Sequence, residues 1–520
     1  MNEIIAILDF GSQYTQLIAR RVRENRVYCE ILPHDTPAEK LRGEQLKGII
    51  LSGGPGSVYE EGAPRADPAI FRMGVPVLGI CYGMQLGTEA LGGKVIPSSE
   101  REFGATPLEI VADDPLFAGM QRKTTVWMSH GDQVREIGSG FVTLARTSSC
   151  AHAAVRHRDT GFIGILFHPE VTHTPEGRIL LNNFLYTVCG CHGDWSMTRF
   201  IEEQVGTLRE RIGDGQVVCA LSGGVDSSVV ALLLHRAIGN RLSCIFVDNG
   251  VLRGGEREQV VSTFAKHFKL DFHLVDASER FLDRLKGVTD PEEKRKRIGH
   301  EFIDVFKEAV TREVMSNGRS VKGARFLAQG TLYPDIIESF SPLGGPSMTI
   351  KSHHNVGGLP RELGFELVEP LRFLFKDEVR ALGRELGLPD QILHRQPFPG
   401  PGLAIRVIGE VTRERLRMLR EADAIVQLEM ERFELYQGIW QSFAILLPVQ
   451  TVGVMGDKRT YEHVVALRIV ESTDGMTANW VYLPRDILTT ISSRISNEVS
   501  GVNRVVLDIS SKPPSTIEWE

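Results

Sequence analysis

The sequence contains no long hydrophobic run. No uncharged apolar stretch in the 520 residues reaches the roughly 20 residues that a membrane-spanning helix needs. Met1 leads directly into the strand-like segment IIAILDF, whereas a secretory signal has a basic region followed by an apolar core. We therefore expect a cytoplasmic protein with no membrane partner.

An excess of positive charge is missing as well. The chain has 59 Lys and Arg against 66 Asp and Glu, which gives a formal net charge of −7 and disfavours a nucleic-acid partner. The 7 cysteines form no CxxC pair, and an odd number scattered over a long chain argues against a disulfide framework. Reduced thiols are expected.

Short β-rich runs alternate with helical patterns through the first two thirds of the chain. Strands are predicted over residues 4–8, 27–32, 48–51, 75–80, 216–221 and 242–247. Helices are predicted over residues 197–211, 227–238 and 256–268. This alternation is typical of α/β folds, so we expect two doubly wound domains with parallel sheets.

Two breaks in the pattern mark the expected domain boundaries. TVCGCHGDW at 187–195 ends the first pattern, and QPFPGPG at 396–402 cannot continue a helix or a central strand. A charged helix at 412–433, strands near 444–452, 464–469 and 504–509, and a helix after Pro484 then predict a small α+β domain. The expected domains are 1–190, 196–395 and 396–520. The charge run PEEKRKR at 291–297 is interpreted as a solvated helix face.

Cys81 is a candidate nucleophile. It lies between a buried-looking strand and a helical run, in the frame Gly79-x-Cys81-x-Gly83, which matches a nucleophile elbow written with cysteine. A helix that starts just after a thiol lowers the pKa of that thiol through its dipole. A lone cysteine is as often a small buried hydrophobic residue, so a base is needed to support this interpretation.

The best candidate for that base is His168. The run GFIGILF ends at His168-Pro169-Glu170, and residues two apart on a strand share one face, so Glu170 can orient the imidazole. Cys81, His168 and Glu170 therefore form a candidate triad. Leu51-Ser52-Gly53-Gly54-Pro55-Gly56 follows another strand and either presents backbone amides to an oxyanion or is a plain turn.

The segments DFGSQ, ILSGGPGS, LGICYG and FHPE, in this order, resemble the class I glutamine amidotransferases over residues 1–190. The resemblance implies that the cysteine attacks the side-chain amide of glutamine and that the histidine protonates the departing ammonia. Water then cleaves the glutamyl thioester. It also implies an oxyanion hole formed by the amides of Gly54 and Tyr82.

A second motif combines small residues with an acid. The residues Ser222, Gly223, Gly224, Val225, Asp226, Ser227 and Ser228 lie between a strand and a helix, where backbone amides and hydroxyls converge on phosphate. No Gly-Lys-Ser/Thr closes the loop, so it is not a Walker loop. Asp226 instead lies where it can hold Mg²⁺ on the phosphates.

The SGGVDSS loop resembles that of the N-type ATP pyrophosphatases, which cleave ATP between its α and β phosphates and adenylate a carbonyl oxygen. The segments VDNG at 247–250, AQGTLYPDIIES at 328–339 and IKSHHNVGGLP at 350–360 are similar to other parts of that family's site. In the last of these, Lys351 is expected to supply the phosphate-binding cation that the loop lacks.

The third segment indicates the substrate. QPFPGPGLAIRV, LPVQTVGVMGDKRTYE and KPPSTIEWE resemble the C-terminal domain of the GMP synthase family. This resemblance implies a homodimer and the substrates glutamine, ATP and xanthosine monophosphate (XMP). It implies that XMP is adenylated, with pyrophosphate released, and then aminated to GMP plus AMP. The implied XMP-binding residues are Arg406, Lys512, Thr516, Ile517 and Glu518.

Other functions remain open from the residues alone. The alternatives are another ATP-pyrophosphatase amidotransferase, either similar to NAD synthetase or tRNA-modifying, and a nucleotide-binding regulator without catalysis. Asparagine synthetases normally begin with cysteine at position 2, where this chain has Asn2, and glutamine-dependent NAD synthetases usually carry a nitrilase-like domain. Arg406 and Lys512 suit a phosphate dianion, but without the resemblance they are equally well explained as solvated surface charges.

Overall fold

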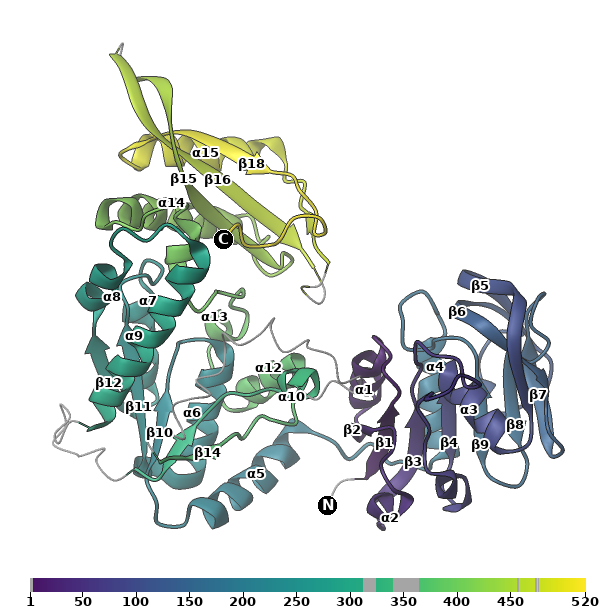
Figure 1. Cartoon of the computed structure of the whole chain (residues 1–520). Helices are drawn as coiled ribbons and strands as arrows, with labels where there is room; N and C mark the ends of the chain where they lie inside the picture. Colours follow the sequence, from purple (N-terminus) through teal and green to yellow (C-terminus); the bar gives the residue numbers. More distant parts are fainter. Residues whose placement is uncertain (1–2, 312–323, 340–363, 456–457, 473–474, 476) are drawn as a thin grey trace. The chain divides into compact units, whose positions relative to one another are not determined.

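The structure is a computed structural model that describes residues 3–311, 324–339, 364–455, 458–472, 475 and 477–520. The chain forms two compact units, Met1–Phe200 with Pro334–Ser347 and Ile201–Tyr333 with Met348–Glu520. Figure 1 shows the sheets and helices of each unit. The boundary expected at residue 396 falls inside the second unit, and the three-domain division stays a prediction.

The first unit contains a nine-stranded sheet with the order β2-β1-β3-β4-β9-β8-β7-β5-β6. Its first five strands in this order are parallel, as expected, and the buried β4 and β9 lie next to each other. These strands are β1 (Ile4–Asp9), β2 (Tyr28–Pro33), β3 (Leu46–Leu51), β4 (Val77–Ile80) and β9 (Phe162–Ile165). The helices of this unit are α1 (Thr15–Glu24), α2 (Ala38–Leu41), α3 (Tyr82–Ala90) and α4 (Gly177–Asn182).

The other half of this sheet is antiparallel, which the sequence patterns had not indicated. Its strands are β5 (Lys94–Ile110), β6 (Lys123–Glu136), β7 (Phe141–Arg146) and β8 (Ala154–His157). Buried residues alternate with less buried ones along much of β6. Such alternation is typical of an antiparallel sheet with one solvated face.

The second unit contains a five-stranded parallel sheet with the order β12-β11-β10-β13-β14, as predicted for a doubly wound domain. The strands are β10 (Val217–Ala220), β11 (Leu242–Asp248), β12 (Asp271–Asp276), β13 (Phe326–Ala328) and β14 (Glu366–Val368). The helices that lie wholly in this unit are α6 (Val225–Ile238), α7 (Glu256–Val260), α8 (Ser278–Leu285), α9 (Pro291–Thr311), α12 (Lys376–Glu385) and α13 (Asp390–Leu393). The first four residues of α5 (Met197–Ile212), and α10 (Tyr333–Ser339) after its first residue, are assigned to the first unit. No helix in the described part of the chain is both long and apolar enough to cross a membrane.

A smaller sheet completes the second unit. Its strands are β15 (Gln441–Met455), β16 (Lys458–Glu471), β17 (Asn479–Trp480) and β18 (Val502–Asp508), accompanied by α14 (Arg413–Arg432) and α15 (Arg485–Glu498). The α+β expectation for this segment is confirmed. One hydrophobic cluster runs from Val218 on β10 to Val502 on β18, so the five-stranded parallel sheet and the C-terminal sheet share a core.

Candidate active sites

Cys81 occupies the turn between β4 and α3. Its backbone angles are φ 51° and ψ −105°, a region that non-glycine residues rarely adopt. The flanking glycines supply space: a Cβ on Gly79 would lie 2.5 Å from the carbonyl of Gly83, and a Cβ on Gly83 would lie 2.4 Å from the carbonyl oxygen of Leu51. The sharp turn that the glycines predicted is present, and the residue with the positive φ is the cysteine itself.

His168 and Glu170 are paired, as the sequence predicted. Nδ1 of His168 and Oε1 of Glu170 are 2.7 Å apart, and both side chains are buried. The strand explanation was wrong, because β9 ends at Ile165 and the pair forms in the following loop. Hydrogen bonds fix this loop: Thr174 Oγ1 donates to the carbonyl of His168 at 2.6 Å, and Arg21 Nε donates to that of Glu170 at 3.1 Å.

The pair keeps the imidazole protonated. Burial lowers the pKa of His168, but hydrogen bonds with Cys81 and Glu170 and the negative charges of these groups outweigh burial and raise this pKa to about 10. The interaction with Cys81 brings all three predicted triad members together. At neutral pH the site therefore holds an imidazolium next to the sulfur, ready to act as an acid.

Gly54 and Tyr82, the predicted oxyanion-hole residues, lie against each other. A Cβ on Gly54 would be 3.3 Å from Cγ of Tyr82. The amides of Cys81 and Gly83 donate to the carbonyls of Ile165 and Ser52, at 2.8 and 3.1 Å. The Tyr82 amide between them is at the first position of α3, where an N–H has no partner within the helix.

One wall of the thiol site was missed from the sequence. The carbonyl of Ser129 on β6 is 3.7 Å from Sγ of Cys81. Gln85, one helical turn after Cys81, donates its Nε2 to the carbonyl of Asp132 at 3.3 Å and so ties α3 to β6. The sequence feature that could have indicated these contacts is the polar stretch SHGDQ at 129–133, which lies in a strand that was not predicted.

The loop from Ser222 to Ser228 is a compact turn between β10 and α6. The hydroxyl oxygens of Ser222 and Ser227 are 3.0 Å apart, and Ser228 Oγ donates to the carbonyl of Gly224 at 2.6 Å. Gly223 has φ 76°, which favours glycine at this position. Hydroxyls and amides thus converge at the N-terminus of α6, an arrangement suited to phosphate.

Asp226 lies beside the segment that follows β13. A Cβ on Gly330 would be 3.4 Å from Cβ of Asp226. β10 and β13 are adjacent, and the strand order reverses between them, which is where open α/β sheets bind ligands. No group of three or more His, Cys, Asp or Glu side chains that could hold a metal ion occurs in the described ranges. Lys351 lies outside the described residues.

Arg406 and Glu518 form a buried ion pair. Arg406 Nε and Nη2 donate to the two carboxylate oxygens at 3.0 and 2.7 Å, and its Cζ is 3.8 Å from the centre of the Phe443 ring. Ile517 packs against the cluster that contains Phe443. Three of the predicted XMP-binding residues therefore share one place, although Arg406 is fully buried rather than a surface charge.

The remaining two have other contacts. Lys512 donates its Nζ to the carbonyl of Gly475 at 2.7 Å, and Thr516 donates its hydroxyl to the carbonyl of Glu518. Arg468, which the sequence analysis missed, is fully buried and donates to the carbonyls of Ser510 and Thr516 at 2.6 and 3.0 Å. The sequence feature that could have identified it is an arginine within the otherwise apolar strand VVALRIV.

The charge run at 291–297 is not entirely solvated, so that interpretation was wrong for one residue. Lys294 is 0% exposed and donates to the carbonyls of Val407 and Ala404 at 2.7 and 3.2 Å, and to the carboxylate of Glu520. Burial lowers the pKa of Lys294, while Glu520 opposes this shift. The helix α9 thereby anchors the end of the chain.

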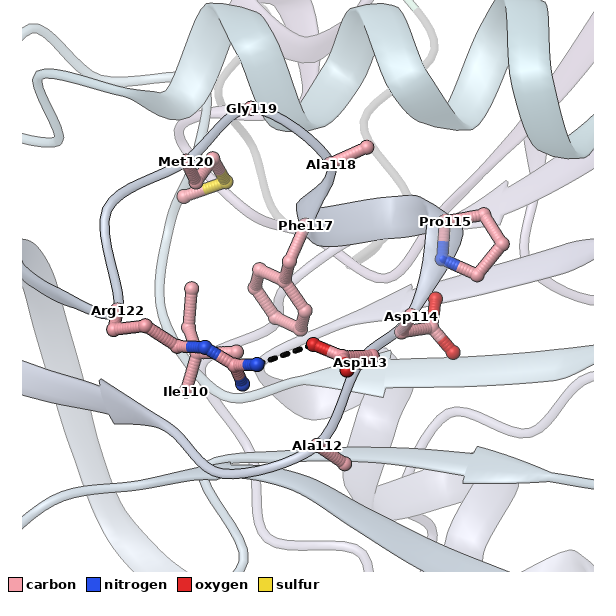
Figure 2. Close-up of a pocket in the computed structure, with 10 residues that line it drawn as sticks. All are labelled: Ile110, Ala112, Asp113, Asp114, Pro115, Phe117, Ala118, Gly119, Met120 and Arg122. Atoms are coloured by element: carbon pink, nitrogen blue, oxygen red, sulfur yellow. Dashed lines mark hydrogen bonds and ion pairs between the residues drawn. The ribbon is translucent and has the colours of Figure 1, made fainter.

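The first unit also has a cavity that contains none of the predicted site residues. Its volume is about 490 Å³, and Figure 2 shows the Asp113–Arg122 ion pair at its edge. It offers no thiol or imidazole for catalysis. Its lining residues are Ile110, Ala112, Asp113, Asp114, Pro115, Phe117, Ala118, Gly119, Met120 and Arg122.

Three family models match successive parts of the chain. Residues 6–188 match the class-I glutamine amidotransferases, residues 206–291 match asparagine synthase, and residues 428–519 match the GMP synthase C-terminal domain. The triad lies in the first match, and the loop from Ser222 to Ser228 lies in the second.

The chain is also similar over its whole length to proteins named glutamine-hydrolysing GMP synthase. The protein from Caldanaerobacter subterraneus subsp. tengcongensis is 58% identical over 519 residues, which cover 100% of this chain and 99% of that protein. The protein from Carboxydothermus hydrogenoformans is 56% identical over 520 residues, with 100% of both chains covered. The protein from Maridesulfovibrio salexigens is 57% identical over 521 residues, covering 100% of this chain and 99% of that one.

Proposed function

The chain belongs to the glutamine-hydrolysing GMP synthases, ATP-dependent ligases that take nitrogen from glutamine, and we propose that it works through two separate sites linked by ammonia. The first site hydrolyses glutamine at Cys81. The second adenylates XMP at the loop from Ser222 to Ser228 and then aminates it to GMP.

At the first site, Sγ of Cys81 attacks the side-chain amide carbon of glutamine. The amides of Gly54 and Tyr82 hold the resulting oxyanion. His168 donates its proton to the departing ammonia, the C–N bond breaks, and a glutamyl thioester remains. Water then cleaves the thioester and returns a proton to the imidazole. The pairing of His168 with Glu170 at 2.7 Å supports this sequence of steps.

At the second site, the C2 carbonyl oxygen of XMP attacks the α phosphorus of ATP and pyrophosphate leaves. Ammonia then attacks C2, and AMP departs with the former carbonyl oxygen. The loop from Ser222 to Ser228 binds the β and γ phosphates through its amides and hydroxyls. Asp226 would hold Mg²⁺, which neutralises charge on the leaving pyrophosphate when bound. Lys351 is proposed to add a cation.

XMP is proposed to bind beside the C-terminal tail, through Arg406, Lys512, Thr516, Ile517 and Glu518. Nη1 of Arg406 is buried and has no hydrogen-bond partner among the residues described. A buried donor without a partner is costly, so a phosphate oxygen is a suitable acceptor. This orphan donor supports Arg406 as a phosphate ligand even though Glu518 occupies its other two nitrogens.

A homodimer through the C-terminal segment is also proposed. Val452 and Tyr461 are register partners on β15 and β16, and Val454 lies on the same face as Val452. These three side chains are 43%, 57% and 76% exposed. Neighbouring exposed apolar side chains on one sheet face support a protein interface. We also propose a cytoplasmic location.

The observation that carries the function is full-length identity of 58% to a glutamine-hydrolysing GMP synthase, together with the paired triad. The test is to incubate the purified chain with ATP, glutamine and XMP and identify the products. GMP, AMP and pyrophosphate in equal amounts are expected, whereas ADP would refute the pyrophosphatase assignment. Asp226→Asn should stop AMP formation yet leave Cys81 open to alkylation.

A further inference from the structure

Arg395 connects the segment after α13 to the phosphate loop. Its Nη1 donates to the carbonyl of Gly223 at 3.0 Å, and its Nη2 pairs with the carboxylate of Glu256 at the start of α7. Glu256 is 4% exposed and also accepts the amide of Arg253 at 3.0 Å. Neither Arg395 nor Glu256 has a role in the two reactions described above.

The contact with Gly223 determines the direction of a loop amide. A peptide unit is planar and trans, so its C=O and the following N–H point in opposite directions. With the Gly223 carbonyl held by Arg395, the Gly224 amide points back into the loop, where it donates to Ser222 Oγ at 3.3 Å. If this peptide flipped, a carbonyl oxygen would replace the amide and repel phosphate.

The guanidinium can fix this peptide because its own segment is anchored. The next residue, Gln396, is buried, and its Oε1 accepts the amide of Ser442 at 2.8 Å. Its Nε2 donates to the carbonyls of Tyr436 and Ile439 at 3.1 and 3.3 Å. Arg395 is thus held by the C-terminal sheet on one side and by Glu256 on the other.

We propose that Arg395 is a positioning residue that holds the Gly223–Gly224 peptide with its amide toward the bound pyrophosphate group. The inference rests on the proposed role of the loop from Ser222 to Ser228. It predicts that Arg395 affects ligands that carry β and γ phosphates and leaves the binding of AMP unchanged, since AMP lacks these phosphates.

The test uses the full-length enzyme with ammonia as nitrogen donor and magnesium-ATP, pyrophosphate and AMP as probes. In Arg395→Met, the KM for ATP and the inhibition constant of pyrophosphate should both rise roughly ten- to a hundredfold, as expected for loss of a charge-assisted hydrogen bond. The inhibition constant of AMP should change by no more than about twofold, which corresponds to about 0.4 kcal/mol. Arg325→Met is the matched control, because Arg325 pairs with Glu366 and its side chain is 67% exposed.

Arg395→Met leaves the Glu256 carboxylate buried without its cation, so a second variant separates positioning from stability. Arg395→Met with Glu256→Gln removes both charges, and we expect it to fold normally and keep the pyrophosphate defect. Recovery of pyrophosphate binding in this double variant would overturn the proposal, as would equal weakening of AMP and pyrophosphate in the single variant.

Ser227→Ala distinguishes this proposal from the loop assignment. If Ser227→Ala weakens pyrophosphate inhibition and Arg395→Met does not, only the role of Arg395 is wrong. If neither variant changes pyrophosphate inhibition, the assignment of the loop fails and the role of Arg395 fails with it.

Discussion

Arg406 and Glu518 are 112 positions apart in the chain and are joined by two hydrogen bonds, of 3.0 and 2.7 Å. The arginine comes from the segment after QPFPGPG and the glutamate from the last three residues. The tail is therefore tied to buried charged residues of the second unit, and its removal affects stability as well as the proposed substrate binding.

Removal of residues 512–520 should destabilise the second unit. Glu520 neutralises Lys294, which is 0% exposed, so truncation leaves a buried ammonium with only two carbonyl acceptors. Loss of one partner of a buried pair costs about 3 to 5 kcal/mol, and the remaining carbonyls favour the lower value. Denaturant unfolding of the second unit measures this change. A truncated chain of unchanged stability would contradict it.

Lys512→Ala tests the proposed XMP contact more selectively than truncation does. It loses a single charge, and the side-chain contact that is removed is the hydrogen bond from Nζ to the carbonyl of Gly475 at 2.7 Å. The KM for XMP should rise roughly ten- to a hundredfold, while the KM for ATP stays unchanged. An unchanged KM for XMP would remove Lys512 from the proposed site.

Cys81→Ala should abolish GMP synthesis from glutamine and preserve synthesis from added ammonia, because ammonia enters the second reaction directly. The measurement is the rate of GMP formation with each nitrogen donor. Equal loss of both rates would show that the two sites are not separate.

Glutaminase activity should depend on pH through His168. The pKa of His168 is raised to about 10, so the imidazolium persists across neutral pH and the rate falls only as pH rises through that value. Glu170→Gln removes a partner that raises this pKa, so the fall should move to lower pH, with a rate loss on the order of a hundredfold. The rate is measured from about pH 6.5 to about pH 10.5, a range chosen to include the pKa of His168 in both the parent and the variant. Glu109→Gln, which changes an exposed carboxylate, is the control. An unchanged midpoint in Glu170→Gln would be inconsistent with this role.

Gly83→Ala should destabilise the first unit. The added Cβ would lie 2.4 Å from the carbonyl oxygen of Leu51 on the neighbouring strand, so backbone must move. Overpacking of this kind costs about 1 to 3 kcal/mol. Gly43→Ala in the same unit is the control, since a Cβ there meets nothing within 4 Å. Equal unfolding midpoints for the two variants would disprove the steric argument.

Val454→Asp should convert the proposed dimer to monomers. Val454 is 76% exposed, and a carboxylate there would be desolvated in the proposed interface. Sedimentation at several concentrations measures the assembly. Val111→Asp, at a site 42% exposed in the first unit, should leave it unchanged. A Val454→Asp variant that sediments as the parent does would place the interface elsewhere.

The central strands and helices were predictable because their patterns are local. The helix predicted over 412–433 is α14, Arg413–Arg432, and the strand predicted over 242–247 is β11, Leu242–Asp248. Motifs at strand ends were equally clear, since Cys81 and Ser222 follow apolar runs directly. Each of these features depends on residues that are neighbours in the sequence.

Features set by distant contacts were not predictable. Lys294 resembles its solvated neighbours on α9 in type, but the partners of its buried ammonium are distant: Glu520 is 226 positions away, and the carbonyls of Ala404 and Val407 are 110 and 113 positions away. The antiparallel strands β5 to β8 are another case, because their pairing depends on contacts with other strands of the sheet and not on their own sequence patterns. The positive φ of Cys81 was also not predicted, because the flanking glycines suggested that a glycine would adopt the strained conformation.

The hydrophobic cluster shared by β10 and β18 limits how this enzyme can be recombined. Exchange of the C-terminal segment with that of a relative would cut through one core instead of between two, and the mismatched halves would leave voids. Chimeras joined near residue 396 should therefore fold poorly, whereas exchange of the whole second unit keeps its core intact. The part of this chain that can be exchanged as a module is therefore the whole compact unit, and not the C-terminal sequence segment.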